Sequence, residues 1–318
     1  MQNVAGRKCE TALAGRRRLR IVIEAAHMTG RIIGPALAAE FDGPSDVAVI
    51  PGTSDYLVAD EFNSRVRMVD AAGNISTVAG NGNHGCQALS GLAVNAPMQW
   101  VRGLAVYPDG SYLIVDENCN MVHKVSAGAD GDIGTADDTI KTVAGTGTAG
   151  YNGDNRTATS AQLNNPRGVA VASDGGFYIA DSLNQRVRRV SPGGTISTVA
   201  GTGVSGSNGD GLPATSAGLD TPRDVDEAPD GGFVIADSNA NRVRRVAPDG
   251  TISTIAGTGT YGTSGNGGPA TAAKIAEPHG VNFADNGDLY ISGAGLLDTG
   301  GSANWTVRRV EQPPGSGT

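Results

Sequence analysis

The sequence has few cysteines, few aromatic residues and no long apolar run, and each shortage excludes a class of protein. Its three cysteines, Cys9, Cys86 and Cys119, cannot all pair within the chain and show no CxxC spacing, so they predict neither a disulfide framework nor a zinc site. Cys86 and Cys119 could be neighbours in the fold, but we interpret all three as structural or incidental. No apolar stretch reaches the roughly 18 residues of a membrane span, and the N-terminus lacks an apolar signal core.

Several catalytic signatures are also absent. The chain contains no Gly-x-Ser-x-Gly elbow, no Gly-x-x-x-x-Gly-Lys-Ser/Thr phosphate loop and no His-Glu-x-x-His motif, so it lacks the familiar hydrolase, nucleotide and zinc-protease signatures. A net charge of −8 argues against a general nucleic-acid binder, because neutralising phosphates requires a concentrated basic surface. One short basic cluster precedes the first strand-like run, and we interpret residues 1–18 as a solvated basic arm; the cluster is Arg16, Arg17, Arg18 and Arg20.

Glycine is the residue in excess, and the excess favours a β fold. Glycine accounts for 48 of 318 residues, while aromatic residues are 4% of the chain. This composition is typical of many short strands joined by tight turns. Hydrophobic residues at 39% supply enough apolar surface for a packed core, which excludes a disordered chain.

The chain repeats one unit five times. Residues 174–190 return with small changes at four other places, and the apolar residues that open the units recur at intervals of 56 to 65 residues. These opening residues are Val47, Leu104, Val169, Val225 and Val281. In the third unit, short runs at 168–172, 177–180, 186–190 and 195–200 alternate with turn residues. Four short antiparallel strands per unit are typical of a propeller blade.

The units resemble NHL repeats. The third unit reads Pro-Arg-Gly-Val from Pro166, Ala-Asp-Ser-Leu-Asn-Gln-Arg-Val-Arg-Arg-Val from Ala180, and Ile-Ser-Thr-Val-Ala-Gly from Ile196. Several consecutive positions agree in each of the five copies, across about residues 44–310. The resemblance implies a β-propeller, most often six-bladed in that family.

The strand count predicts five blades in this chain. Residues 19–24 stand where a fourth strand would lie before the first unit, and the last unit offers three strands that end at about residue 310. Pairing these two ends would close a ring of five four-stranded antiparallel blades and remove exposed sheet edges. We therefore expect an all-β chain with an arm at 1–18, a single propeller at 19–311 and a flexible tail at 312–318. Six blades are the alternative.

Positions at which the units differ are candidates for function. One such position stands just before each inner strand, so its residues should surround one mouth of the central channel; they are Ser45, Arg102, Arg167, Arg223 and His279. Three arginines and a histidine would suit a carboxylate or phosphate, so we expect these four residues to bind ligand. The alternative is that each arginine reaches a carboxylate or carbonyl of an adjacent blade.

The inner strands also carry unexpected acids. Most units read Gly-Val-Ala-Val, whereas the fourth has Asp224 and Asp226, the first has Asp46 and the fifth has Asn282. Carboxylates on a closely packed strand need a partner, a cation or water. These four residues could form an oxygen-rich metal site suited to Ca²⁺, with His279 and Asp226 as catalytic candidates. Salt bridging of the aspartates to the arginine ring is the alternative.

Two further acidic patterns have a simpler interpretation. The acids at the ends of the second strands are expected to cap turns by accepting backbone N–H groups; they are Asp60, Asp116, Asp181 and Asp237. The acidic hairpin at residues 128–138 lacks the spacing of an EF-hand, so we interpret it as a solvated turn.

Two functions are consistent with these features. The NHL resemblance implies a rigid platform that binds a protein, peptide or glycan ligand on one propeller face, and we favour this function, for a monomer without nucleic acid. A more remote resemblance to lactonases and strictosidine-synthase-like enzymes implies a metal-assisted hydrolase or esterase at the channel mouth, with Ca²⁺ as its cofactor. Fold alone does not decide between them. The compartment stays open, and an extracytoplasmic location would follow if a signal had been removed.

Overall fold

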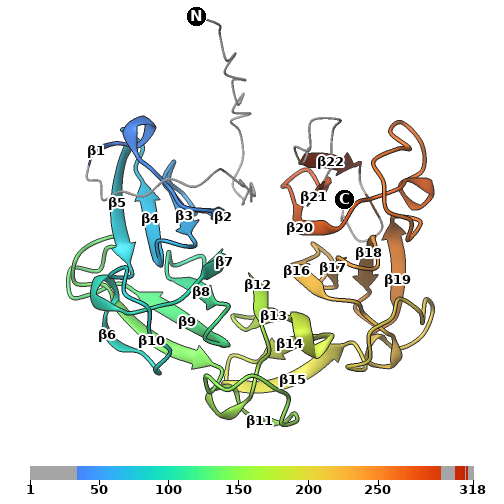
Figure 1. Ribbon diagram of the computed structural model, residues 1–318, viewed down its shortest axis with the longest axis horizontal. Coiled ribbons are helices and arrows are strands. Elements are labelled where there is room, and N and C mark those ends of the chain that lie inside the picture. Colours follow the sequence, from blue (N-terminus) through green and yellow to red (C-terminus); the bar gives the residue numbers. More distant parts are fainter. Residues whose placement is uncertain (1–33, 295–304, 312, 314–318) are drawn as a thin grey trace, which may run out of the picture.

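Five antiparallel sheets follow one another around a common axis, from blue to red in Figure 1. The computed structural model describes residues 34–294, 305–311 and 313. The main strands of each sheet pair in chain order from the inside outward, so each repeat unit forms one blade. The prediction of an all-β propeller with five blades is confirmed.

The blades share three regular strands. The innermost strands are β2 (Pro44–Val49), β7 (Val101–Val106), β12 (Pro166–Val171), β16 (Pro222–Glu227) and β20 (Pro278–Phe283). The second strands are β3 (Tyr56–Asp60), β8 (Tyr112–Asp116), β13 (Phe177–Asp181), β17 (Phe233–Asp237) and β21 (Leu289–Gly293). The third strands are β4 (Arg65–Val69), β9 (Met121–Ser126), β14 (Arg186–Val190), β18 (Arg242–Val246) and β22 (Thr306–Val310).

The blades differ in their outer strands. The fourth strands are β5 (Asn74–Ala79), β10 (Thr139–Ala144), β15 (Thr195–Ala200) and β19 (Ile252–Ala256). The first three blades add a short outermost strand, which is β1 (Gly34–Pro35), β6 (Ser90–Leu92) or β11 (Arg156–Thr157). The sheets therefore hold five, five, five, four and three described strands, where the repeat predicted four in each. Residues 19–24, the predicted closing strand, lie outside the described residues, as do the predicted arm and nearly all of the tail.

Short 3-10 helices of one turn lie in the connecting segments between strands. Five of them precede inner strands and are η1 (Ala36–Ala38), η2 (Ala93–Asn95), η3 (Ala158–Ser160), η5 (Ala214–Ser216) and η6 (Ala270–Ala272). The sixth, η4 (Ser182–Asn184), forms the turn between β13 and β14. In the connection that leads to the fourth blade, η5 lies in the stretch Pro-Ala-Thr-Ser-Ala that begins at Pro213. In the described part of the chain, no helix has the length and apolar character needed to cross a membrane.

The core consists of four apolar clusters, each of which lies between two neighbouring blades. Leu57 and Val66 of the first blade pack with Leu104 and Ile114 of the second, and all four side chains are fully buried. Equivalent clusters join the second to the third, the third to the fourth and the fourth to the fifth blade. Burying one such side chain stabilises the fold by about 1.5–3 kcal/mol. Each blade is therefore stabilised by its neighbours, as in other repeat arrays.

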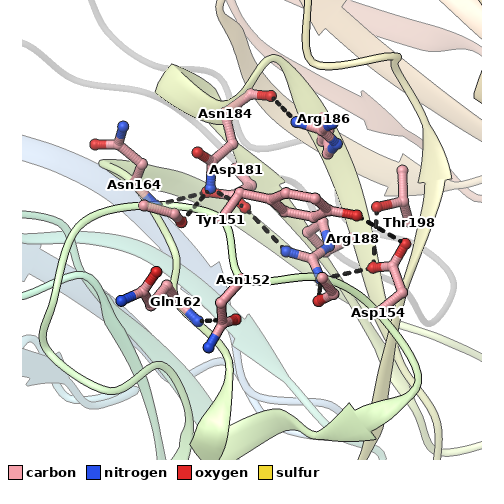
Figure 2. A network of polar contacts seen from close by, with 12 residues as sticks. Tyr151, Asn152, Asp154, Gln162, Asn164, Asp181, Asn184, Arg186, Arg188 and Thr198 are labelled. Carbon is pink, nitrogen blue, oxygen red and sulfur yellow. Dashed lines mark hydrogen bonds and ion pairs between the residues drawn. The ribbon is translucent and has the colours of Figure 1, made fainter.

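Each acid at the end of a second strand holds the segment that enters its blade. Asp181 accepts hydrogen bonds from the backbone N–H of Asn164 and the amide of Asn184, both at 2.8 Å. It also faces the fully buried Arg188, whose guanidinium donates to Asp154 at 2.7 Å (Figure 2). Burial raises the pKa of Asp181 to about 6. Backbone N–H groups donate in the same way to Asp60, Asp116 and Asp237. The predicted capping role is confirmed.

Two of the three cysteines are joined, although the sequence implies no disulfide framework. Cys86, in the segment between β5 and β6, and Cys119, in the turn between β8 and β9, form a disulfide. Their Cα atoms lie 4.9 Å apart although they are separated by 33 positions in the sequence. The suggestion that Cys86 and Cys119 could be neighbours is confirmed, and the path of a blade connection over the next blade, rather than local spacing, brings the two cysteines together.

Candidate functional site

The five predicted ring residues occupy irregularities of the inner strands. In the fourth blade Pro222 pairs with Asp237 and Asp224 pairs with Ala236, so Arg223 falls between paired positions. The register between first and second strands shifts at the same place in the other four blades. A bulge bends the strand and redirects a side chain. The repeat thus presents one side chain per blade at the same end of the inner hairpins.

All five ring residues line one cavity at the channel mouth. They are Ser45, Arg102, Arg167, Arg223 and His279, and the lining is completed by Asp46, Gly103, Gly168 and Asp224. The cavity has a volume of about 50 Å³ and opens to solvent. A Cβ atom at Gly168 would lie only 2.3 Å from Oδ1 of Asp224, so glycine is required where these inner strands converge.

Two of the three arginines form ion pairs with buried glutamates. Nη1 of Arg102 lies 2.7 Å from Oε1 of Glu61, and its Nε lies 3.1 Å from Oε2 of Glu117. Nε of Arg167 lies 2.9 Å from Oε1 of Glu117. Burial raises the pKa of Glu61, against the opposite effect of Arg102. This side of the mouth therefore balances its own charge.

The other side of the mouth has a different composition. The guanidinium of Arg223 contacts the imidazole Nε2 of His279 in the next blade. Glu277 lies close to both, at 3.6 Å from Arg223 and 3.9 Å from His279, and its side chain is 40% exposed. Burial and the neighbouring Arg167 lower the pKa of Arg223 to about 10. Burial and Arg223 lower the pKa of His279 to about 3, so its imidazole is neutral at pH 7.

A repeat position that the sequence analysis overlooked explains this asymmetry. Directly after the last residue of the second strand, the five blades carry Glu61, Glu117, Ser182, Ser238 and Ala294. Glu61 pairs with the arginine of the second blade and Glu117 with that of the third. The third blade supplies Ser182, whose hydroxyl donates to the carbonyl of Pro222 at 2.6 Å. Arg223 of the fourth blade therefore lacks the glutamate that a preceding blade supplies elsewhere.

The predicted metal-site acids bond to backbone N–H groups. Asp46 accepts from Leu104 at 2.7 Å, and Asp224 accepts from Val281 at 3.0 Å. Each contact crosses from one inner strand to the inner strand of the next blade. These carboxylates thus join neighbouring blades at positions where other units have glycine.

Asp226, two residues further along β16, also bonds to the inner strand of the fifth blade. Its Oδ2 accepts from the N–H of Phe283 at 2.9 Å and from Nδ2 of Asn282 at 3.2 Å. Asn282 is buried, and its Oδ1 has no hydrogen-bond partner among the described residues. No three His, Cys, Asp or Glu side chains within the described ranges are grouped so that they could hold a metal ion.

The acidic hairpin of the second blade also bonds to its own backbone. Asp137 accepts from the N–H of Ala129 at 2.7 Å and from the hydroxyl of Thr135 at 2.7 Å. Asp138 accepts from the N–H of Gly134 at 2.7 Å. These contacts fit the interpretation of the hairpin as an acidic turn.

Comparisons with known proteins agree with the repeat architecture. Residues 137–208 match the family model of the teneurin NHL domain. Teneurin-m of Drosophila melanogaster is 29% identical over 227 residues, which cover 64% of this chain. The chain is an NHL-repeat β-propeller. The aligned part spans 14% of the first curated relative, a chloroplastic protein of Arabidopsis thaliana named SUPPRESSOR OF QUENCHING 1, and 8% of Teneurin-m.

Solved structures share the fold of this NHL propeller at low identity. An auxiliary nutrient binding protein from Bacteroides ovatus superposes with a TM-score of 0.57 at 15% identity, covering 86% of this chain and 61% of that chain. A candidate gluconolactonase superposes with a TM-score of 0.51 at 15% identity, covering 86% of this chain and 82% of that chain. These likenesses establish the architecture and no further property of the NHL propeller.

Proposed function

We propose that this NHL propeller is a binding module that holds a carboxylate of its ligand at the channel mouth, between Arg223 and His279. The observation that carries the proposal is the asymmetry of the ring. Arg102 and Arg167 are matched by buried glutamates, whereas Arg223 lies against an imidazole and a half-exposed Glu277. A planar guanidinium pairs well with a carboxylate.

Charge also favours an anionic ligand in this sector. The pKa values of Arg223 and His279 are both lowered by burial and by neighbouring arginines, which disfavours their cationic forms. A ligand carboxylate would favour these forms and would raise the pKa of His279 in the complex. Between the pKa of about 3 in the free protein and the higher value in the complex, binding takes up a proton. Affinity should therefore increase as the pH falls below neutral.

Histidine NMR with acetate and glutarate as probes tests the proposal. The chain has four histidines, and a His279→Gln variant assigns the ring resonances of His279. We expect a saturable shift of these resonances with either carboxylate, but not with chloride at equal ionic strength. Arg223→Gln should abolish the shift. Arg309→Gln is the matched control, because the Arg309 side chain on β22 is 49% exposed and lies outside the cavity lining. A shift that persists in Arg223→Gln would overturn the proposal.

The disulfide provides evidence on the cellular compartment in which the protein is found. Disulfides form and persist in oxidising environments and are rare in the cytosol. The Cys86 and Cys119 pair therefore supports an extracytoplasmic location as part of the proposed function. Non-reducing peptide mapping of protein isolated from its native source would test this, and free thiols at both positions would contradict it.

A divalent-cation-dependent hydrolase of the lactonase type is the second candidate function. It is supported by the buried Oδ1 of Asn282 beside the carboxylate of Asp226, because amide and carboxylate oxygens suit Ca²⁺. The test is the melting temperature after EDTA treatment and after addition of Ca²⁺, for the wild type and for Asp226→Asn. A Ca²⁺-dependent increase that the variant loses would favour this candidate, since an ion bound to the folded state stabilises it. No increase in the wild type would contradict it.

A further inference from the structure

Exposed apolar side chains surround the arginine ring. The chain has two tryptophans, and both lie beside ring residues: Trp100 precedes Arg102 by two positions, and Trp305 packs edge-on against His279 with ring centroids 5.2 Å apart. Trp100 is 36% exposed and Trp305 is 45% exposed. Phe62 follows Glu61 directly and is 41% exposed.

The backbone places these side chains on the same face as the ring. The backbone N–H of Phe62 donates to the carbonyl of Asp42, and that of Glu117 donates to the carbonyl of Trp100. In each blade, the turn after the second strand is thus bonded to the segment that precedes the inner strand. Leu183 of the third blade occupies the repeat position of Phe62 and is 51% exposed.

Phe62 and Trp100 form an apolar ledge across the first and second blades. Their ring centroids lie 6.0 Å apart with planes at 80°, an edge-to-face arrangement. We call this pair the aromatic ledge. It is next to Arg102 on the side of the mouth where charge is already balanced. The mouth face therefore carries both apolar and cationic side chains.

The backbone at Trp100 is strained. Its φ of 52° is in the left-handed region, where the third and fourth blades have Asn165 at 52° and Thr221 at 56°. A bulky residue in this region is unusual, and sparsely populated backbone conformations cost roughly 1–3 kcal/mol. Trp100 is nevertheless 36% exposed, so part of its ring is accessible to a partner beside its contact with Phe62.

We infer that the mouth face docks a peptide segment of a protein partner, in which an acidic side chain reaches Arg223 and His279 and an apolar side chain packs on the aromatic ledge. This inference rests on the proposed carboxylate site. Tryptophan and arginine are enriched in the energetically dominant centres of protein interfaces, and such centres combine apolar contact with a few paired charges. The arginine sector supplies the charge complementarity to an acidic segment.

A peptide suits this surface better than a glycan. Sugar rings stack on a flat aromatic face, whereas the aromatic ledge presents one ring edge-on to the other, with planes at 80°. Leu183 adds apolar surface without a flat ring face. This irregular apolar surface matches an aliphatic or aromatic side chain.

Selection from an unbiased phage-displayed peptide library on the whole chain is the first step of the test. We expect recovered sequences to carry Asp or Glu within a few positions of an aromatic or aliphatic residue. The best synthetic peptide is then titrated by tryptophan fluorescence, with Trp305→Phe to isolate the signal of Trp100. Recovered sequences without an acidic residue would overturn the inference.

Variants of the ledge complete the test. Trp100→Asn should weaken peptide binding by about tenfold or more, and asparagine is compatible with the backbone because Asn165 adopts the same φ. Val204→Ser is the control, because Val204 is 71% exposed in a blade connection and should leave binding unchanged. Peptide affinity that is unaffected by Trp100→Asn would overturn the inference.

Acetate titration separates failure of the docking surface from failure of the carboxylate site. Trp100→Asn should retain the acetate-induced shift of His279, whereas Arg223→Gln should lose both responses. Retention of the acetate shift without peptide binding rejects the docking surface alone. Loss of the acetate shift in the wild type rejects the proposed function. If an oligogalacturonate binds more tightly than any selected peptide, the inference of a peptide ligand is overturned in favour of an acidic glycan.

Discussion

The guanidinium of Arg223 contacts the imidazole of His279, so at this point of the ring a cation faces a neutral base instead of a carboxylate. The guanidinium of Arg167, at the corresponding position of the third blade, lies 2.9 Å from Glu117 of the second blade. One substitution in the repeat, from glutamate to Ser182, separates these two arrangements. A symmetrical scaffold thereby acquires one sector that differs in charge from the others.

The first prediction concerns the pH dependence of stability. The pKa of His279 is about 3 in the folded protein and about 6.5 in an unfolded chain. The unfolded state therefore binds more protons between these values, and stability decreases as the pH falls through 6.5. The loss should approach about 1.4 kcal/mol per pH unit below 6.

Urea-induced unfolding at pH 7.5 and pH 5 measures this effect. His279→Gln should show a smaller decrease in the free energy of unfolding than the wild type, because glutamine does not titrate. The groups that face the imidazole, Arg102, Arg167, Arg223 and Glu277, are retained in both proteins. Equal pH dependence in the two proteins would contradict the assigned pKa.

The second prediction compares two glutamates of the mouth. Glu117 is 2% exposed and pairs with both Arg102 and Arg167, so Glu117→Gln removes the glutamate from Arg167 and leaves Arg102 with Glu61 alone. We expect a loss of about 3 kcal/mol in the free energy of unfolding. Glu277→Gln should cost less than about 1 kcal/mol, because the Glu277 side chain is 40% exposed and its ion pair with Arg223 is screened by solvent. Chemical denaturation of both variants checks the ranking, and equal losses would argue against a structural role for Glu117.

The third prediction concerns the disulfide. Cross-linking Cys86 to Cys119 restricts the unfolded chain, and its removal should lower the free energy of unfolding by roughly 2–4 kcal/mol. The double variant Cys86→Ser, Cys119→Ser should unfold at the same denaturant concentration with and without reductant, whereas the wild type should respond to reductant. Cys9→Ser is the control and should behave as the wild type. An insensitive wild type would show that the disulfide does not form or does not stabilise the fold.

Much of the fold was predictable because the signals that define it are local. Alternating apolar residues and turn residues recur in every unit, so strand order, blade count and the position of the arginine ring follow from repeat phase. The ion pairs were not predictable in this way. Glu61 and Glu117 were missed although they differ from Ser182 and Ser238 at the same repeat position. Their partners lie 41 and 50 positions away and become neighbours only when blades stack.

The contacts of the inner-strand acids were likewise not predictable from the sequence. Asp46 and Asp224 stood out because they replace glycine, and the structure places both in the cavity lining. Their contacts with the N–H groups of Leu104 and Val281 cross between blades, so no pattern within one strand indicates them. The register shift that redirects the ring side chains is equally invisible in the residue pattern, because both hairpin strands keep their apolar alternation.

The last prediction concerns closure of the propeller. In the first four blades the third strand pairs with a fourth, whereas within the described residues β22 of the fifth blade pairs with β21. Its outer side borders a groove that Ala270, Ile275 and Val307 help to line, and Val307 is 65% exposed. An exposed strand edge of this kind offers unpaired backbone groups. The sequence predicts that residues 19–24 fill it.

Two truncations test this closure. Removal of residues 1–18 should leave the melting temperature unchanged, because those residues are the predicted arm. Removal of residues 1–24 should lower the free energy of unfolding by about 4 kcal/mol, the burial of two or three aliphatic side chains. It should also expose the edge of β22 and promote self-association, which light scattering detects. If both truncations unfold like the full chain, the closing strand is not residues 19–24 and the edge of β22 requires another partner.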